Sequence, residues 1–471
     1  MVFGVRSRLS ISAALPSTRR RAVPLAFAAV VVVLAMTGVA AERRFRPPDD
    51  RPPIQADALA RAGIRDFSSE RLSLYADIDP EIARTLPPLA DQLYDRLVET
   101  FGPPLPDPEG KPFGVTAFLM KDRQTFLGQG LIPSAVRNFL HGQHLGYAFW
   151  MDDQESPYYR RHLLLHEYTH CFMLAERPAV RDRPELWYLE GMAEVFGTHR
   201  LDRNGKLAFD IMPQSTEEVL GIGRIEMIEK AVARGDFHSV RQVRELGGEA
   251  FSQSRSDPYA WGWALCHFLG NHPRYRERFR QLHVHRTDGQ FGATFESVYG
   301  DDADRLEWDW EWFITDLKYG LELSHSGLTF AEGEPLQAPR TVQVDSRGSW
   351  QSTGVRLAEG ESIAVSAEGR ATLNATTRPW VSEPAGITIE YEGGVPIGCL
   401  VGWILPDAPE ALGHPERTAQ VCVGSGGAVT AARSGTLYLR INDHPSGRGN
   451  NEGAYAVSLR PTVPERKGSA R

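Results

Sequence analysis

The chain has 471 residues, of which 42% are hydrophobic and 24% are charged, so it holds apolar material for about three folding units. This composition excludes a largely disordered protein. The 52 lysines and arginines against 60 aspartates and glutamates give a net charge of -8, which excludes the overall basic field typical of nucleic-acid-binding proteins. We therefore expect no nucleic acid among its partners.

The first expected element is an export signal within residues 1–45. Five arginines precede residues 22–41, an uncharged stretch of 20 residues that ends in the small side chains GVAA. Such a stretch can cross a bilayer as an anchor, whereas its small residues would allow cleavage as a signal peptide, and both remain open. The arginine excess favours an N-terminus inside the cell. We expect an extracytoplasmic protein, secreted, periplasmic or held in the membrane only through this segment if it is uncleaved.

A proline-rich spacer at residues 46–63 and a linker at residues 326–340 bound the first large block, residues 64–325. Its N-terminal part reads as mixed α/β, with strand-like and helical patterns. The strands are expected at 71–78 and 113–120 and a helix at 80–100. Its C-terminal part reads as helical. The helices are expected at 159–175, 185–198, 216–233, 259–270 and 306–321.

Residues 341–462 change to short alternating runs separated by glycine and polar residues, which is typical of an all-β sandwich. The clearest runs are 361–367, 386–391, 436–442 and 454–459. A polar tail at 463–471 closes the chain.

The cysteines leave the disulfide pattern open. Cys171 and Cys266 belong to the first block, and Cys399 and Cys422 belong to the second. An oxidising compartment allows one or two disulfides, but four cysteines permit three pairings. None has CxxC spacing, so a thiolate zinc site is not indicated.

The sequence His166-Glu167-Tyr168-Thr169-His170 places two imidazoles four residues apart on one helical face, where both can reach one metal ion. Glu190 follows His170 by 20 residues, enough for a turn and a second helix. It can complete the three-ligand His2Glu set that catalytic zinc sites use. Glu194, one turn beyond Glu190, fits a carboxylate that accepts the outer N–H of His166 or His170.

With its HExxH and WxxEGxAE motifs, the chain resembles the gluzincin metallopeptidases of the thermolysin and M1 aminopeptidase type over about residues 64–323. The resemblance implies an α+β gluzincin domain in which His166, His170 and Glu190 bind Zn²⁺. It also implies that Glu167 is the general base that activates the metal-bound water. The same assignment follows from the chemistry, because an adjacent carboxylate must take and return a proton.

The oxyanion donor is less clearly marked. Family members use a Tyr or a His, and Tyr259, at the start of a helix, is the candidate here, with a core aromatic as the competing interpretation. His267 faces the same two interpretations. Residues 146–151 (GYAFWM) are expected to be the edge strand that binds extended substrate, and His141 and His144 just before it would contact substrate or be loop histidines.

A second candidate metal site lies near the C-terminus. The loop from Asp443 to Asn451 is dense in Asp, Asn and Gly between two strands, so it offers the hard oxygen ligands that Ca²⁺ prefers. Turn chemistry explains the same composition, and composition alone favours this second interpretation.

The pattern NDxPxxxGNNxG resembles the calcium-dependent galactophilic lectin of the PA-IL type, closely over residues 436–459 and more loosely back to about 341. The implied Ca²⁺ ligands are the side chains of Asp443, Asn450 and Asn451, the carbonyl of Gly447 and a carbonyl near Leu373. The family's sugar site also uses a His and a Gln in the segment that corresponds to 378–386, and this sequence has neither. Calcium and carbohydrate are therefore implied, but galactose is not.

These observations predict an exported zinc-dependent peptidase whose calcium-binding, lectin-like domain would target glycosylated protein or peptide substrates. The first alternative is a carbohydrate-binding surface protein with a catalytically inactive peptidase-like domain, against which the intact Glu167 argues. The second is a structural cell-envelope protein, which would not need the zinc set.

Overall fold

The computed structural model describes residues 45–49, 51–136, 138–175, 185–219, 223–252, 256–284, 291–328, 331–374, 376, 378–407 and 420–462. The chain divides into two compact units, Met1–Arg43 and Arg44–Arg471. Apart from residue 45, the expected signal or anchor lies outside the described residues, as does the tail at 463–471. Within the described ranges, no helix is long and apolar enough to cross a membrane.

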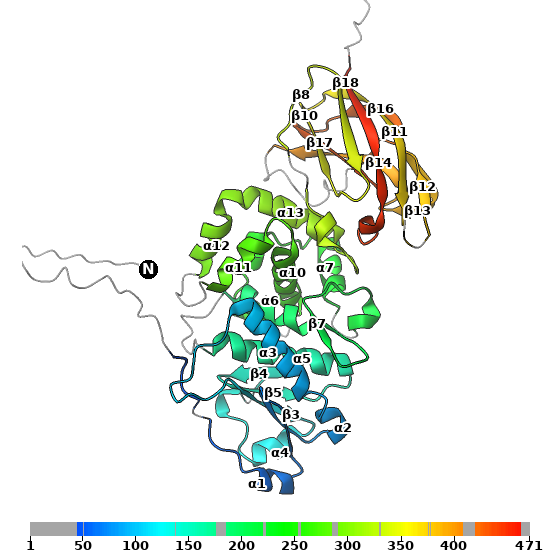
Figure 1. Ribbon diagram of the computed structural model, residues 1–471. Coiled ribbons are helices and arrows are strands. Elements are labelled where there is room, and N and C mark those ends of the chain that lie inside the picture. Colours follow the sequence, from blue (N-terminus) through cyan, green and yellow to red (C-terminus); the bar gives the residue numbers. More distant parts are fainter. Residues whose placement is uncertain are drawn as a thin grey trace, which may run out of the picture. The chain divides into compact units, whose positions relative to one another are not determined.

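A five-stranded mixed sheet opens the second unit, in the order β1-β2-β3-β5-β4 (Figure 1). The central strands β2, β3 and β5 are parallel, whereas β1 and β4 are antiparallel to their neighbours at the two edges. The strands are β1 (Arg65–Ser68), β2 (Leu72–Ala76), β3 (Val115–Met120), β4 (Gly142–Leu145) and β5 (Ala148–Asp152). The expected strands at 71–78 and 113–120 correspond to β2 and β3.

The expected edge strand at 146–151 is wrong in its position in the sheet. Those residues form β5, which pairs with β3 on one side and β4 on the other. The apolar run Phe149, Trp150 and Met151 suits an internal strand that is covered on both faces. The true edge, β4, is short, polar and begins with glycine, so its pattern is weak in the sequence.

Helices cover both faces of this sheet. α3 (Pro87–Phe101) and α5 (Pro157–Leu174) pack on the face that carries Leu74, Ala117 and Phe149. α1 (Ala56–Arg61) and α4 (Arg123–Gly128) lie in the cluster of the opposite face, with Phe118 and Trp150.

The expected spacer at 46–63 is instead largely part of the domain. Arg46 is buried and donates from Nη2 to the Lys111 carbonyl at 2.7 Å, and the Tyr147 hydroxyl donates to the Pro47 carbonyl at 2.7 Å. The segment continues into α1, whose Leu59 joins the core. Proline-rich composition predicts an extended chain, but it does not tell whether that chain lies against a protein surface.

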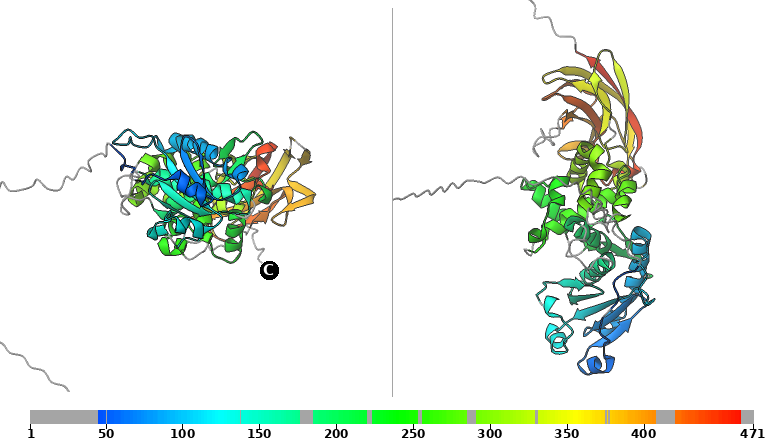
Figure 2. Two further views of the ribbon diagram at one scale, coloured as in Figure 1. Left: turned by 90° about the horizontal axis from the view of Figure 1, so that it is seen from below. Right: turned by 90° about the vertical axis from the view of Figure 1, so that its left-hand side faces the viewer.

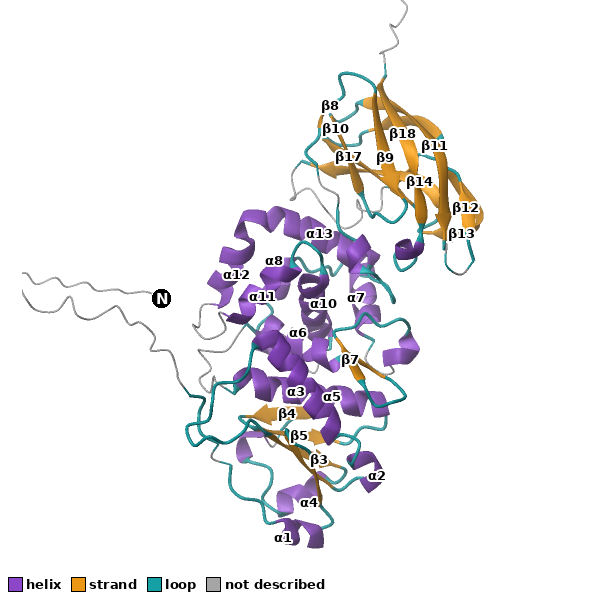
Figure 3. Ribbon diagram, in the orientation of Figure 1, coloured by secondary structure: helices purple, strands orange, loops and turns teal. Residues whose placement is uncertain are grey.

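The helical part follows the sheet: Figure 2 shows the change from the blue and cyan N-terminal part to the green helices, and Figure 3 shows the strands in orange and the helices in purple. The expected helices are present, although the one expected at 216–233 is a short 3-10 turn (Thr216–Val219) followed by α7, and the one expected at 306–321 ends at Asp316. The helices that matter for the site are α6 (Leu186–Gly197), α7 (Arg224–Ala233), α10 (Asp257–Asn271) and α13 (Ala303–Asp316). The others described are α2 (Pro80–Ala83), α8 (Val240–Arg244), α9 (Gly248–Ser252), α11 (Arg276–Val284) and α12 (Phe291–Tyr299), with a hairpin of β6 (His199–Leu201) and β7 (Leu207–Phe209).

The C-terminal region is β-rich and consists of two sheets around one apolar cluster that includes Val365, Leu437 and Val457. One sheet has the order β13-β14-β17-β10-β8, with β15 beside β14. The other has the order β12-β11-β18-β9, with β16 beside β11. Their bounds are β8 (Glu334–Pro335), β9 (Arg340–Asp345), β10 (Gln351–Leu357), β11 (Ser362–Leu373), β12 (Trp380–Ser382), β13 (Ala385–Glu392), β14 (Val395–Pro406), β15 (Val421–Cys422), β16 (Gly426–Thr430), β17 (Gly435–Ile441) and β18 (Glu452–Pro461).

The linker expected at 326–340 is partly incorporated into this region, because β8 pairs with β10 and β9 begins at Arg340. Helix α13 also packs against the sheet: Trp308 and Trp312 share an apolar cluster with Trp350 and Trp403. The helical part and the β-rich part are therefore joined by a packed contact as well as by the chain.

Candidate metal centre and active-site cleft

The HExxH motif lies in the middle of α5. The Ser156 side chain accepts a hydrogen bond from the Tyr159 N–H and Pro157 occupies the first turn, so the helix begins as a capped, proline-initiated helix. Its repeat brings His162, His166 and His170 to successive turns of one face. All three histidines are buried.

Three side-chain atoms from α5 and α6 converge on one point. His166 Nε2 and His170 Nε2 lie 3.0 Å apart, and Glu190 Oε2 lies 3.2 Å from the second and 3.4 Å from the first. Donors that bind one zinc ion tetrahedrally at about 2.1 Å are separated by about 3.4 Å. The triangle therefore has the size that a three-ligand zinc site requires, and its N2O composition fits the same metal.

The approach of α6 to α10 determines where Glu190 stands. A Cβ on Gly191 would lie 2.7 Å from Cys266 Sγ, and one on Gly262 would lie 3.0 Å from the Trp187 carbonyl. The two glycines thus allow the helix backbones to approach closely. This contact holds α6 with Glu190 and Glu194 directed toward α5.

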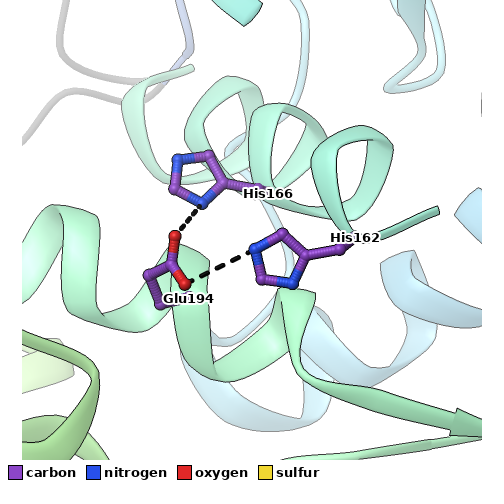
Figure 4. Close-up of side chains that lie close together, drawn as sticks. All are labelled: His162, His166 and Glu194. Carbon is purple, nitrogen blue, oxygen red and sulfur yellow. Dashed lines mark ion pairs between the residues drawn. The ribbon is translucent and has the colours of Figure 1, made fainter. Parts of the chain in front are cut away.

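The Glu194 side chain contacts three residues around the site. Its Oε1 lies 3.3 Å from His166 Nδ1, and its Oε2 lies 3.4 Å from His162 Nε2 (Figure 4). Arg224 on α7 donates a hydrogen bond to each carboxylate oxygen, from Nε to Oε2 at 2.9 Å and from Nη2 to Oε1 at 2.8 Å. Burial alone would raise the pKa of Glu194, but Arg224 and the two histidines hold that pKa well below its ordinary value. The carboxylate is therefore ionised and fixes the orientation of His166.

The sequence left open whether Glu194 accepts the outer N–H of His166 or of His170, and the structure places one of them next to it. The partner is His166, while His170 Nδ1 is buried without a hydrogen-bond partner among the described residues. His162, His166 and Glu194 could also be imagined as a second metal site. Arg224 already supplies the cation there, and His166 directs its other nitrogen at Glu190.

We expect Glu194→Ala to weaken zinc binding by about 10- to 100-fold, the usual effect of removing a carboxylate that orients a ligand histidine. Competition with a fluorescent zinc chelator measures this affinity. Glu217→Ala, which removes an exposed glutamate, serves as the control. Unchanged affinity in Glu194→Ala would show that His166 keeps its orientation without the carboxylate.

Glu167 points from α5 toward the edge strand β4. Its Oε2 is buried without a hydrogen-bond partner among the described residues, and His144 Nδ1 lies 3.4 Å from it. A Cβ on Gly142 would lie 2.5 Å from Glu167 Oε1. The His144 ring also packs on His170, with centroids 4.5 Å apart. The edge strand thus contacts both the candidate base and a candidate ligand.

The two candidates for the oxyanion donor, Tyr259 and His267, lie in different places. Tyr259 lies in the cleft, its ring centroid 6.3 Å from that of His166, and burial together with Glu190, Glu194 and Glu167 raises its pKa. His267 lies elsewhere: it stacks on Trp263 and its Nδ1 is 3.1 Å from Asp210 Oδ1. His267 is therefore a core residue.

A cavity of about 470 Å³ opens above these groups. Its lining includes His141, Gly142, His166, Glu167, Arg224 and Tyr259. A larger, mostly apolar cavity of about 580 Å³ is lined by Phe118, Leu145 and Trp150, and it includes none of the HExxH residues. The smaller cavity is the candidate active-site cleft because the reactive groups face it.

The expected calcium residues also come together. Asn451 donates from Nδ2 to Asp443 Oδ2 at 2.8 Å and accepts from the Asn374 N–H at 3.1 Å. Asn450 Oδ1 is buried without a hydrogen-bond partner among the described residues. A Cβ on Gly447 would lie 3.3 Å from Asp443 Oδ2, so the backbone at Gly447 runs beside that carboxylate. Asp443 Oδ2 and the unpartnered Asn450 Oδ1 are oxygens of the kind that a hard cation such as Ca²⁺ prefers, whereas Asn451 turns its amide nitrogen toward Asp443 and its oxygen to the Asn374 N–H.

Sequence reasoning missed three residues that surround the cluster of His166, His170 and Glu190. His162 carried a signal, because it precedes His166 by the same four residues that separate the motif histidines. Gly142 was read only as part of a glycine-containing segment. Arg224 carried no signal, since it comes from a helix that begins 30 residues after Glu194.

No family model matches the chain, and no curated protein matches it. Among solved structures it is similar to the EclA N-terminal domain, described as a PllA-like lectin, with a TM-score of 0.21 and 23% identity. The match covers 26% of this chain and 95% of that chain. Similarity at this level decides neither fold nor function. The chain is a multidomain protein with a mixed α/β part and a β-rich C-terminal region.

Proposed function

We propose that the protein is an exported zinc-dependent peptidase of the gluzincin type. The observation that carries the proposal is the triangle of His166 Nε2, His170 Nε2 and Glu190 Oε2, with sides of 3.0 to 3.4 Å, beside the Glu167 carboxylate, which lines the same cavity as His166. A structural histidine cluster would not need a second buried carboxylate beside it, and Glu167 Oε2 has no hydrogen-bond partner among the described residues, although His144 Nδ1 lies 3.4 Å away.

An ion held by this triangle would polarise a scissile carbonyl and make a water molecule a stronger acid. Glu167 would accept the proton of the attacking water through its unpartnered Oε2 and return it to the leaving amine. Tyr259 stays protonated because its pKa is raised, so its hydroxyl is available to donate a hydrogen bond to the developing oxyanion.

The sheet edge supports a peptide as the substrate. Among the described residues, β4 pairs with β5 on one side and has no strand on the other, and its Gly142 and His144 face the HExxH helix. An extended peptide could add to this edge as a further strand and bring its backbone carbonyl over the metal ligands.

The proposal is tested by the metal content of the purified chain and by hydrolysis of a mixed protein substrate, with and without a chelator. We expect about one zinc per chain and chelator-sensitive hydrolysis. Glu190→Ala should lose both, because only two ligands remain. Glu99→Ala, which removes an exposed glutamate on α3, should keep both. Zinc retention without hydrolysis of any substrate would favour the alternative of an inactive peptidase-like domain.

Gly142→Ala should lower hydrolysis without unfolding the protein. The added Cβ would lie 2.5 Å from Glu167 Oε1, and the end of that flexible side chain can move aside more readily than the backbone. We expect a lower kcat with zinc content and thermal midpoint close to those of the unmodified chain. Gly128→Ala is the matched control, because a Cβ there meets nothing within 4 Å. Full activity of Gly142→Ala would mean that Glu167 works from a different position.

A second candidate function, calcium-dependent carbohydrate binding, is favoured by the loop from Asp443 to Asn451 and its buried, unpartnered Asn450 Oδ1. This loop also packs against the helical part. A Cβ on Gly320 would lie 3.2 Å from Ser446 Cβ, and one on Gly449 would collide with the Glu322 carboxylate. Removing the whole β-rich region would therefore disturb the helical part, so point substitutions are the appropriate test.

Two measurements on the full chain test this function. Calorimetric titration with Ca²⁺ measures calcium binding, and a glycan array with and without Ca²⁺ measures carbohydrate binding. Asp443→Asn should lose calcium and any glycan binding, since it removes the loop's charged ligand. Glu390→Gln, on the exposed face of β13, should keep both. No heat of calcium binding in the unmodified chain would remove this candidate and leave the peptidase proposal intact.

A further inference from the structure

Two cysteines of the β-rich region face each other at close range. Cys399 Sγ and Cys422 Sγ are 2.8 Å apart. Cys399 Sγ also lies 3.5 Å from the Leu400 oxygen, and the other two thiols contact backbone carbonyls: Cys171 Sγ lies 3.6 Å from the Ala148 oxygen and Cys266 Sγ lies 3.9 Å from the Trp187 oxygen. Of the disulfide pairings that the sequence left open, these positions favour Cys399 with Cys422.

The backbone around the two thiols is held by strand pairing. Cys399 lies in β14, opposite Ala385 of β13, and its carbonyl accepts from the Asn442 N–H at 2.8 Å. Cys422 lies in β15, opposite Val401 of β14. The Val423 N–H donates to the Leu400 carbonyl at 2.9 Å. Since both residues are fixed on the same strand pair, a bond between their sulfurs needs only a small movement of side chains.

We propose that Cys399 and Cys422 are an intramolecular disulfide site that a small-molecule disulfide, such as oxidised glutathione, closes. The Cys422 thiolate attacks the glutathione S–S bond, forming a mixed disulfide and releasing one reduced glutathione. The Cys399 thiolate then attacks the Cys422 sulfur, forming the protein S–S bond and releasing the second glutathione. The two protein thiols lose two protons and two electrons, and one oxidised glutathione becomes two reduced molecules.

The exposure of the two thiols to solvent determines which of them reacts with glutathione first. Cys422 is exposed whereas Cys399 is buried, so only Cys422 is open to the oxidant. Burial, and then the hydrogen bond with Cys422, raise the pKa of Cys399 to about 12, which makes it the slower nucleophile. The expected export of the chain places it where such oxidants act.

The bond would anchor the strand that supports the candidate calcium loop. The cysteines lie 23 positions apart, so the bond closes a loop at the base of the segment between β14 and β15. Next to Cys399, the Gly398 N–H donates to the Asn442 carbonyl at 2.6 Å, one residue before Asp443. The disulfide site rests on this geometry and on the expected export of the chain, and it does not depend on the proposed peptidase activity.

The test counts thiols in the full-length protein after equilibration with a mixture of reduced and oxidised glutathione. Free thiols are alkylated in denaturant, and mass spectrometry of a non-reducing digest locates the rest. We expect two alkylated cysteines, Cys171 and Cys266, and a linked peptide pair containing Cys399 and Cys422. Four alkylated cysteines, or a bond that involves Cys171 or Cys266, would overturn the proposal.

Single variants test the order of the steps. Cys399→Ser should accumulate a glutathione adduct on Cys422, because the resolving thiol is missing. Cys422→Ser should leave all three remaining cysteines alkylated. Cys171→Ala, the control, should still form the bond and leave one alkylated thiol. A glutathione adduct that persists in the unmodified chain beside a free Cys399 would contradict the second step.

Discussion

Glu167→Gln should lower hydrolysis by about 10²- to 10⁴-fold, the contribution typical of a general base, while the zinc content remains that of the unmodified chain. The amide occupies the same buried space beside Gly142 but cannot accept a proton from water. Because Glu167 is not in the ligand triangle, its loss should leave metal affinity nearly unchanged. Steady-state kinetics combined with metal analysis of the same sample provides the measurement.

A comparison with Glu190→Ala distinguishes the loss of a general base from the loss of a metal ligand. Both variants should be inactive, but only Glu190→Ala should lose zinc, since it removes a ligand. An active Glu167→Gln enzyme would exclude Glu167 as the base. Zinc loss from Glu167→Gln would instead assign this carboxylate to the metal.

Asp316→Ala should lower the free energy of unfolding by about 3 to 5 kcal/mol, the usual result of removing one partner of a buried ion pair. Asp316, at the end of α13, lies 2.7 Å from Arg448 Nη1 and 3.4 Å from Arg440 Nη1. All three side chains are almost fully buried. The substitution would leave two guanidinium groups in a region where water cannot replace the carboxylate.

Urea denaturation of the full chain measures this effect, with Asp304→Ala as the control on an exposed turn of the same helix. The control should cost less than about 1 kcal/mol. Burial alone would raise the pKa of Asp316, but Arg448 and Arg440 lower it below its ordinary 3.8. Its stabilisation is therefore present above pH 3.8 and lost as the pH falls through the lower folded-state pKa. A loss below 1 kcal/mol for Asp316→Ala would show that water or other groups already compensate the arginines.

Local patterns in the sequence were enough to predict the elements that carry the chemistry. The spacing of His166 and His170 requires only helical geometry, and α5 and α6 supplied it at the expected places. The strand alternation of residues 436–442 and 454–459 likewise corresponds to β17 and β18. In these cases the signal and the structure both depend on residues close together in the chain.

Features that depend on distant partners escaped prediction. Arg224 reaches Glu194 only because α7 packs beside α6, and nothing around Arg224 distinguishes it from a surface arginine. The edge position of β4 depends on which strands pair, so the more hydrophobic β5 was mistaken for it. The segment at 46–63 looked like a spacer because its contacts, such as Arg46 with the Lys111 carbonyl, join residues far apart in the chain.

Arg224 and the packing of α5 on α6 both hold Glu194, so the surroundings of His166 and His170 are positioned by contacts within the polypeptide. Small zinc domains behave differently, since they unfold without their metal. An apoprotein built in this way would be a stable storage form. If the chain is the zinc peptidase proposed above, it should stay folded when a chelator removes the metal and recover activity once zinc is restored.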